Sequence, residues 1–363
     1  MKKIAGKYNT AIAFLNELEE TATEQITELC NQEFIKDAKI RIMPDAHAGA
    51  GCVIGTTMTI TDKIVPNLVG VDISCGILAV KIDTQEVDFE RLDNSIRKHI
   101  PSGFDVHKFK NDEFDLKELK CFNNLTNVKH LDCSLGTLGG GNHFIEIDKD
   151  LAGNFWLLIH SGSRNIGKQV AEIYQHKAYN SLKNIGIHKD LAYLEDEEFQ
   201  NYLSDMKYLQ KWATRNREVM VEKIMVGMRW SSLEKIETIH NYIDIENMIL
   251  RKGAVSAQRD EMLVIPINMR DGTLLCKGKG NPDWNFSAPH GAGRLMSRNQ
   301  AYKQLSIDDF VASMKDVYTT TVSKKTLDEA PMAYKPIEEI LEFVDDTLEV
   351  IDTMKPIYNF KAS

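Results

Sequence analysis

The stretch SAPHGAGRLMSR, from Ser287 to Arg298, places one histidine in front of two glycines and two arginines. Glycine lets the backbone approach a ligand closely, and the four-residue spacing predicts that Arg294 and Arg298 share one helix face. Arginine binds phosphate oxygens bidentately, and neutral imidazole can attack phosphorus. The stretch therefore suits phosphate chemistry with His290 as the nucleophile. A glycine-rich turn before a helix with two solvated arginines is an equally good interpretation of this stretch alone.

Composition limits the class of protein. The chain has 363 residues, of which 43% are hydrophobic and 27% are charged, as is usual for a soluble globular protein. No apolar run approaches the roughly 20 residues of a membrane span, and the first residues lack the apolar core of a signal peptide. None of the six cysteines forms a CxxC pair, so we expect reduced thiols and a cytoplasmic location.

Charge and patterning limit the organisation. A formal charge of −9 argues against indiscriminate coating of nucleic acid, so any RNA contact is expected to be focal. No repeat, low-complexity tract or linker interrupts the sequence, which predicts one continuous domain over residues 1–363.

Hydrophobic periodicity predicts helices around residues 23–34 and 199–224 and buried strands at residues 77–82 and 156–159. A short strand at Ile40 and Ile42 is expected to break at Pro44 into a loop that carries Asp45. A final helix is expected to begin at Pro336, with a buried stripe that continues to residue 351. Residues 83–135 are uneven, and we expect no chemistry from them.

Asp72 and Cys75 form a DxxC motif just before the predicted strand at residues 77–82. A carboxylate and a thiolate this close can share a divalent metal ion; thiolate suits zinc, and manganese accepts mixed oxygen, nitrogen and sulfur ligands. Alone the motif is weak, because a buried cysteine is more often a small hydrophobic side chain.

Two histidine motifs lie close together in the sequence, each beside glycines. His143 follows the triple glycine of LGTLGGGNHFIEI, and His160 ends a buried strand at the SGSR turn into a helix. A histidine at the end of a strand, followed by a glycine turn and a helix N-terminus, can bind metals and anions. Either motif alone is more typical of a structural histidine, and the pair favours a site.

The candidate metal ligands are Asp72, Cys75, His143, His160 and His240. Five ligands exceed the needs of one tetrahedral ion, and a thiolate can bridge, so two adjacent ions are the economical interpretation. The candidate phosphate-binding cations are Arg164, Arg294 and Arg298.

The ordered motifs resemble those of the RtcB RNA ligases. The matching pieces are PDAHAGAG, GVDISCG, LGTLGGGNHFIEI, IHSGSRNIG, YLSDMKYLQKWATRNREVM, HNYI, RKGA, PHGAGRLMSR, DEAPMAYKPI and NFKA. The resemblance implies an α+β fold, with packed β-sheets flanked by helices around a central metal cleft. It also implies an enzyme that uses GTP and two Mn²⁺ ions to join RNA 3′-phosphate or 2′,3′-cyclic phosphate ends to 5′-hydroxyl ends.

The resemblance also implies roles for residues. His290 would attack the α-phosphorus of GTP and carry GMP, and Asp45 would support catalysis. Cys75 would bridge one Mn²⁺, held with Asp72 and His143, and a second, held with His160 and His240. Contacts to nucleotide or phosphate are implied for Asn142, Glu146, Arg164, Asn241, Arg294, Arg298 and Lys361, with Glu146 and Lys361 on the guanine nucleotide.

The chain departs from the family pattern at several positions. Pro289 stands where most members carry a cysteine, Ser74 replaces an asparagine, and Ile77-Leu78 stands where an arginine is usual. Residues 267–271 replace the guanine-side PGSMG segment. The chain resembles shorter members coupled to a peptide-release-factor homologue, which implies RNA repair. The natural RNA, the choice of GTP or ATP, the oligomeric state and an archease-like activator stay open.

Two other function classes stay open beside the ligase. One is a metal-dependent phosphoesterase or cyclic phosphodiesterase that has lost ligation. The other is a non-catalytic RNA- or ribosome-binding paralogue, against which the retention of every ligand type argues.

Overall fold

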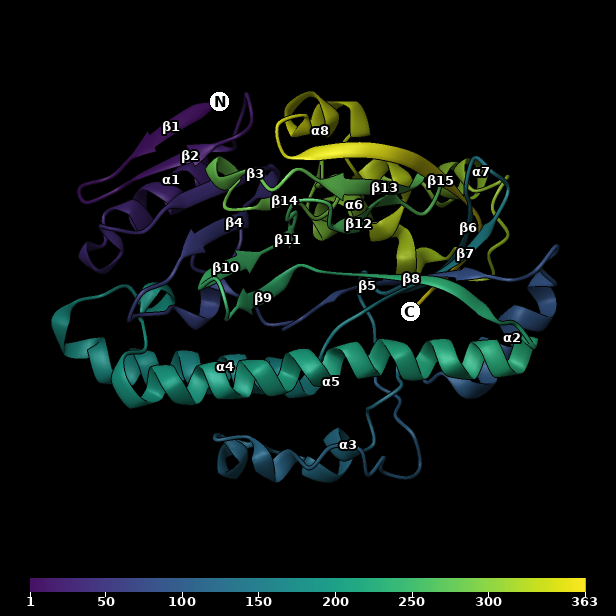
Figure 1. Cartoon of the computed structure of the whole chain (residues 1–363), viewed down its shortest axis with the longest axis horizontal. Helices are drawn as coiled ribbons and strands as arrows, with labels where there is room; N and C mark the ends of the chain where they lie inside the picture. The colour runs from purple at the N-terminus through teal and green to yellow at the C-terminus, as the bar shows by residue number, and fades with distance from the viewer. Residues whose placement is uncertain (363) are drawn as a thin grey trace.

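Two large β-sheets carry the fold, and the computed structural model describes residues 1–362 (Figure 1). The first sheet has the order β1-β2-β3-β4-β10-β9, with β2 and β3 parallel and the other neighbours antiparallel. Its strands are β1 (Lys2–Ala5), β2 (Thr10–Ala13), β3 (Ile40–His47), β4 (Ile54–Thr59), β10 (Ile249–Lys252) and β9 (Asn241–Asp244).

The second sheet is antiparallel throughout and has the order β12-β13-β15-β6-β7-β5-β8. Its strands are β12 (Met262–Asn268), β13 (Gly272–Gly278), β15 (Leu348–Lys361), β6 (Phe144–Lys149), β7 (Phe155–Ser161), β5 (Gly76–Ile82) and β8 (Ser232–Ile239). The backbone N–H of Val264 on β12 donates to Thr238 Oγ1 on β8 at 3.0 Å, so this sheet curls until its two edges meet. A small third sheet pairs β11 (Ala254–Ser256) with β14 (Ser287–Pro289).

Helices cover these sheets, and the longest is α5, with 33 residues (Figure 1). The helices are α1 (Glu20–Cys30), α2 (Phe89–His99), α3 (Val128–Asp132), α4 (Arg164–Leu182), α5 (Asp196–Met228), α6 (Arg298–Gln304), α7 (Ile307–Ser313) and α8 (Ile337–Val344). The mixture of helices with largely antiparallel sheets confirms the predicted α+β class.

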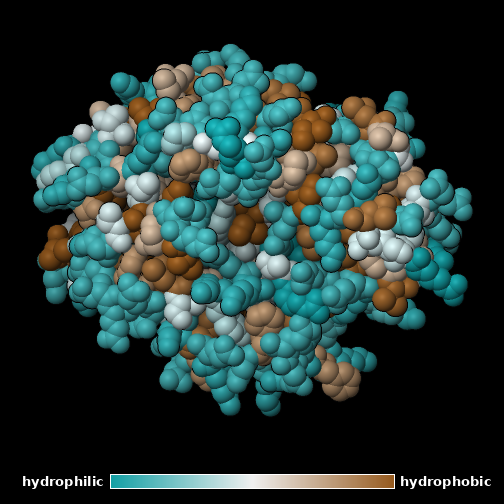
Figure 2. All heavy atoms as spheres, in the orientation of Figure 1, coloured by the Kyte–Doolittle hydropathy of each residue, from teal (hydrophilic) through white to brown (hydrophobic). Residues whose placement is uncertain are grey.

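Strand β5 is buried on both faces, because α5 covers one face and the curled sheet covers the other. Leu78 and Val80 pack in a cluster with Met220 of α5, whereas Ala79 packs with Val264 of β12. The predicted strand and the predicted long helix are therefore both present, and the α5 methionines fill the core as expected. On the face shown in Figure 2, hydrophilic side chains predominate and hydrophobic ones form small patches. Among residues 1–362, no helix is both long and apolar enough to cross a membrane.

Strand β3 does not break at Pro44, contrary to the prediction. It runs from Ile40 to His47, so Asp45 lies in a strand and not in a loop. The pairing of β3 with β4 is irregular between Ile42 and His47. Because the ladder is interrupted there, proline removes no ladder hydrogen bond and the extended chain can pass through it.

The predicted final helix is too long. Helix α8 ends at Val344, and residues 348–361 form β15, which inserts between β13 and β6. Leu348 is buried, but it pairs with Gly278 of β13 and not along a helix face. The first helix also differs at its ends, since α1 begins at Glu20 and stops at Cys30, and Phe34 lies in a short 3₁₀ turn.

Candidate active site

A cleft of about 290 Å³ opens beside the ends of β5, β6 and β7. Most of the predicted site residues line it: Asp72, Cys75, Asn142, Glu146, His160, His240, Asn241, His290, Arg294, Arg298 and Lys361. Asp45, His143 and Arg164 lie behind this lining. Asp45 contacts His290, His143 contacts Asp72, and Arg164 contacts His143. Side chains from distant parts of the sequence therefore meet in one place.

Strand pairing explains why the ligands meet. Strand β5 lies between β7 and β8, so Gly76 pairs with Ser161 on one side and with Ile239 on the other. Cys75 precedes Gly76, His160 precedes Ser161 and His240 follows Ile239. On the far side of β7, His160 pairs with Phe144, the residue after His143.

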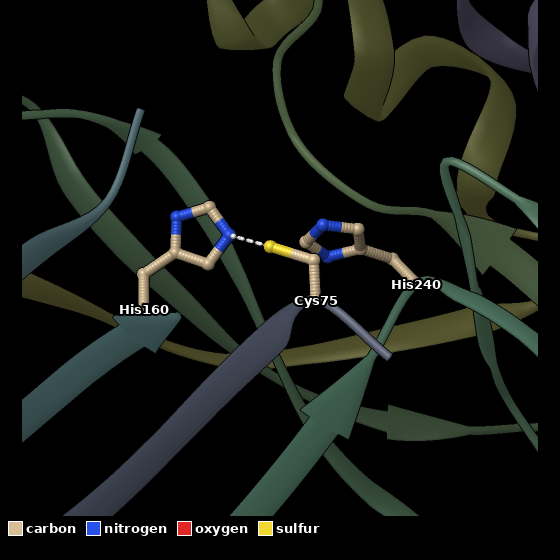
Figure 3. Close-up of side chains that lie close together, drawn as sticks. All are labelled: Cys75, His160 and His240. Atoms are coloured by element: carbon tan, nitrogen blue, oxygen red, sulfur yellow. Dashed lines mark hydrogen bonds between the residues drawn. The ribbon is translucent and has the colours of Figure 1, made fainter. Parts of the chain in front are cut away.

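Five side chains form two triads that share one sulfur. Asp72, Cys75 and His143 make the first triad. Cys75, His160 and His240 make the second, which Figure 3 shows. Within each triad the ligand atoms lie within 4.8 Å of one another. The Sγ atom of Cys75 lies 3.2 Å from Nε2 of His160 and 3.4 Å from Nε2 of His143. The donor set fits two divalent ions with a bridging thiolate.

Hydrogen bonds to the outer ring nitrogens aim two of these histidines at the shared sulfur. Nδ1 of His143 lies 2.8 Å from the Leu138 carbonyl, and Nδ1 of His160 lies 3.2 Å from the Asn142 carbonyl. A carbonyl only accepts, so Nδ1 of His160 carries the proton and its Nε2 presents a lone pair to Cys75. His143 has competing partners, because its Nδ1 also faces the Arg164 guanidinium, a donor, and its Nε2 lies 2.9 Å from Asp72 Oδ2, an acceptor. Asp72 Oδ1 is buried and has no hydrogen-bond partner among the described residues, which leaves it available to a ligand.

Burial keeps the imidazoles neutral. It lowers the pKa of His143 and holds the pKa values of His160 and His240 well below the usual range. Burial alone would raise the pKa of Asp72, but the contact with His143 and the nearby charge of Arg164 outweigh it and lower this pKa. Burial, and then the charge of Asp72, raise the pKa of Cys75 well above its ordinary value. A bound divalent cation would displace that thiol proton.

His290 is held by Asp45. Its Nδ1 lies 2.6 Å from Asp45 Oδ2, and its backbone N–H donates to the same oxygen at 3.1 Å. The Asp45 carboxyl is fully buried. With the proton on Nδ1, Nε2 keeps its lone pair, and the ring lies 4.9 Å from that of His240 between centroids. Gly293 has φ +75°, and a Cβ there would approach the Asp45 backbone to 3.0 Å, so glycine permits this contact.

Arg294 and Arg298 do not share a helix face, contrary to the prediction. Arg294 lies in extended backbone bridged to Tyr334, and α6 begins only at Arg298, after the Ser297 N-cap. Both arginines nevertheless contact Glu329 Oε1, at 3.3 and 3.1 Å. They are thus paired with a carboxylate inside the cleft.

Lys361 completes the group around Glu329. Its Nζ lies 2.9 Å from Glu329 Oε2 and donates to the Asn142 carbonyl at 3.1 Å. Burial would raise the pKa of Glu329, but Lys361 and Arg298 outweigh it and hold this pKa at about 2. Glu329 lies within the quoted DEAPMAYKPI piece, but its periodicity gave no sign that it would gather three cations.

Asn241 and Arg164 hold other parts of the site in place. Asn241 braces the loop that carries Asp72 and Cys75, because its Nδ2 donates to the Asp72 carbonyl at 3.3 Å and its Oδ1 accepts from Gly253 N–H at 2.8 Å. Arg164 begins α4, and its guanidinium lies so close to Gly139 that a Cβ there would overlap it. Its Nη1 lies 3.0 Å from Nδ1 of His143.

Sequence reasoning missed Arg217 of α5, which is fully buried behind the ligands. Its Nη1 donates to the carbonyls of Ser74 and Ser161 at 2.8 and 2.6 Å, and its Nη2 lies 2.7 Å from Glu237 Oε1. It thereby ties the Cys75 loop to the end of β7. The available signal was an arginine on the buried side of a helical pattern, four residues after Ala213.

The chain is similar in sequence to RtcB proteins along nearly its whole length. The family model described as tRNA-splicing ligase RtcB matches residues 25–132 and 116–362. The RNA-splicing ligase RtcB of Escherichia coli (strain K12) is 32% identical over 394 residues, covering 95% of each chain. The tRNA-splicing ligase RtcB of Nanoarchaeum equitans is 25% identical over 417 residues, covering 88% of this chain and 87% of its own. The protein of that name from Methanococcus maripaludis is 26% identical over 443 residues, covering 96% and 92%.

These matches span the segments that bring the two triads and His290 together, and they confirm the resemblance seen in the motifs. The chain belongs to the RtcB family.

Proposed function

We propose that this chain is an RNA ligase that uses GTP and Mn²⁺ to join RNA 3′-phosphate or 2′,3′-cyclic phosphate ends to 5′-hydroxyl ends. The observation that carries the proposal is the position of His290, which Asp45 holds with Nε2 unprotonated, beside the buried Cys-His cluster. The names of the relatives, RNA-splicing and tRNA-splicing ligases, support RNA as the substrate.

In this proposal His290 Nε2 attacks the α-phosphorus of GTP. A nitrogen–phosphorus bond forms while the bond to the leaving pyrophosphate breaks, and the Nδ1 proton stays with the Asp45 contact, which stabilises the positive charge gained by the ring. The guanylate then passes to the RNA 3′-phosphate, and the 5′-hydroxyl displaces GMP. The first of these two steps breaks the nitrogen–phosphorus bond and frees His290, and the second forms the new phosphodiester bond and releases GMP.

Two Mn²⁺ ions would be held by the two triads, with Cys75 in both. Bound there, they would neutralise phosphate oxygens near the histidine. Around them, Asn142, Asn241, Arg164, Arg294 and Arg298 would orient phosphates, and Glu146 and Lys361 would contact the guanine nucleotide. For Arg294 and Arg298 this requires exchange of part of their pairing with Glu329 for phosphate.

We further propose that residues 1–363 form one catalytic domain and that the enzyme acts in RNA repair in the cytoplasm. The six cysteines are all free thiols, as a reducing compartment requires.

The direct test is covalent labelling with GTP that carries the label on its α-phosphate, in the presence of Mn²⁺. Wild type and His107→Ala should retain the label through an acid-labile linkage, because the His107 ring contacts the Gly136 carbonyl and Lys223 and does not line the cleft. His290→Ala should lose it. Equal labelling of wild type and His290→Ala would overturn the nucleophile assignment.

The other function classes give different products. A cyclic phosphate end that opens but is never joined, even with GTP present, would identify a phosphoesterase. Tight RNA binding without metal, unchanged in Cys75→Ala, would identify a binding paralogue.

A further inference from the structure

Two carboxyl side chains share the cleft side of β6. Glu146 and Asp148 lie two residues apart on one strand, so they point to the same face, and they are 2% and 0% exposed. The alternate residues, Ile145 and Ile147, pack on the opposite side with the cluster that contains α5. Glu146 lines the cleft, whereas Asp148 is fully buried with its carboxyl beside that of Glu146.

The two carboxyls have unequal partners. Glu146 Oε2 accepts a hydrogen bond from Asn359 Nδ2 at 2.5 Å, and the charge of buried Lys361 acts on it. Neither oxygen of Asp148 has a hydrogen-bond donor among the described residues, and the neighbouring Thr273 hydroxyl does not reach hydrogen-bonding geometry. The cation whose charge acts on Asp148 is Lys355, whose side chain lies at the surface.

Two buried carboxyls in contact cannot both be ionised, so the pair must hold one proton. The proton belongs on the group whose anion is less well stabilised, and that group is Asp148. A protonated carboxyl donates one hydrogen bond, and the Glu146 carboxylate beside it is a charged acceptor. Burial raises the pKa of both carboxyls, and that of Asp148 well above its ordinary value, which agrees with the proton on Asp148.

We propose that Asp148 is a positioning residue: as a neutral acid it donates to Glu146, keeps Glu146 ionised, and so makes Glu146 a pure acceptor that selects guanine over adenine. The selectivity rests on the proposed function, because it requires a nucleotide in the cleft. The shared proton itself does not.

A second unsatisfied acceptor supports guanine. Asn359 lines the cleft, is 1% exposed, and its Oδ1 has no hydrogen-bond partner among the described residues. Glu146 and Asn359 thus offer two neighbouring acceptors. Guanine presents a ring N–H and an adjacent amino group, whereas adenine presents a ring nitrogen that only accepts. A protonated Glu146 would instead donate and would suit adenine.

Infrared spectroscopy tests the shared proton without any nucleotide. At pH 8 wild type should show the C=O stretch of a protonated carboxyl, and Asp148→Asn should lose it. Asp150→Asn is the matched control, because the Asp150 carboxylate accepts hydrogen bonds from Asn154 and Trp156, and its pKa is lowered. The band of the protonated carboxyl should therefore persist in Asp150→Asn. Absence of the band in wild type, or its survival in Asp148→Asn, would overturn the proposal.

Two competition experiments test selectivity. In one, GTP and ATP compete for binding to the apoenzyme, and in the other they compete in covalent labelling of the enzyme. Asp148→Asn still donates to Glu146, so its GTP preference should stay within about twofold of wild type. Asp148→Leu removes the donor and should lower the preference by about tenfold or more. Unchanged preference in Asp148→Leu would overturn the selectivity role, with melting temperature showing that the variant folds. Failure of wild type to bind or be labelled by GTP would instead defeat the proposed function and this selectivity with it, while the infrared result would stand separately.

Discussion

His290 Nδ1 and Asp45 Oδ2 lie 2.6 Å apart, although 245 residues separate them in sequence. The same oxygen accepts the backbone N–H of His290, so ring and backbone are both fixed. The carboxylate specifies one tautomer, with the proton on Nδ1 and the lone pair on Nε2. This tautomer is the one that the proposed nucleophilic role of His290 requires.

Asp45→Asn is expected to reverse that tautomer. The asparagine amide can donate to Nδ1, which moves the ring proton to Nε2 and blocks attack. Nucleotide labelling of His290 should slow by about 100-fold or more, in the range of lost acid–base or tautomer control. The rate of adduct formation measures the effect. Asp105→Asn, at an exposed site, should label as wild type. Wild-type labelling by Asp45→Asn would show that the contact only anchors the loop.

Local sequence patterns predicted the ligands because each sits at a feature visible in its own segment. Cys75 lies just before a run of apolar residues, and His160 ends another, so both strands and both side chains could be placed. The Asp45 contact could not be derived from local pattern. It depends on β3 running on through Pro44, which is permitted only because β4 does not pair there.

The C-terminal segment shows where periodicity fails. Residues 337–351 fit a helix stripe, yet Leu348 begins β15, because β13 and β6 both need a partner strand. Pairing between distant strands decided that segment, and no window of fifteen residues contains that information. The same strand delivers Asn359 and Lys361 to the cleft. Only family resemblance had pointed to Lys361.

Metal content should distinguish the shared ligand from an unshared one. Cys75→Ala should abolish both Mn²⁺ sites, because its sulfur belongs to both triads, whereas His240→Ala should spare the site of Asp72 and His143. Anomalous scattering from Mn²⁺-soaked crystals locates each ion. Cys133→Ala, a cysteine outside both triads, is the control and should keep two ions. Two ions in Cys75→Ala would reject the bridge.

Acid stability should depend on Glu329. Its pKa is about 2 in the folded protein against 4.5 ordinarily. A carboxyl whose pKa is lower in the folded protein than in the unfolded chain stabilises the fold at pH values above its unfolded pKa. This stabilisation is lost as the pH falls from about 4.5 towards 2. Glu329 therefore contributes about 3 kcal/mol to the free energy of unfolding at neutral pH, since a pKa difference of one corresponds to about 1.36 kcal/mol. Urea unfolding across this pH window measures the slope.

The slope should flatten in Glu329→Gln, which cannot titrate, although that variant will be less stable at neutral pH because Arg294, Arg298 and Lys361 lose their ion pairs with Glu329. Glu338→Gln, at an exposed position of α8, should keep the wild-type slope. An identical slope in all three proteins would mean that Glu329 does not govern acid unfolding.

Arg217 is expected to support both the stability of the fold and the affinity for Mn²⁺. Arg217→Met fills the same space but leaves the Ser74 and Ser161 carbonyls without a donor inside the core. Two unsatisfied buried acceptors and a broken pair with Glu237 should cost about 2–5 kcal/mol in the free energy of unfolding. The Cys75 loop would lose its tie to the end of β7, so Mn²⁺ affinity should fall as well.

The two effects can be separated. Arg215 lies two residues earlier on α5 and pairs only with partly exposed glutamates, so Arg215→Met should lose well under about 1 kcal/mol and bind Mn²⁺ as wild type does. Urea denaturation and Mn²⁺ titration of both variants give the comparison. If Arg217→Met is destabilised yet binds Mn²⁺ with wild-type affinity at a temperature where it is folded, the arginine supports the core alone. Loss of both would show that the ligand loops depend on this one buried side chain for their spacing.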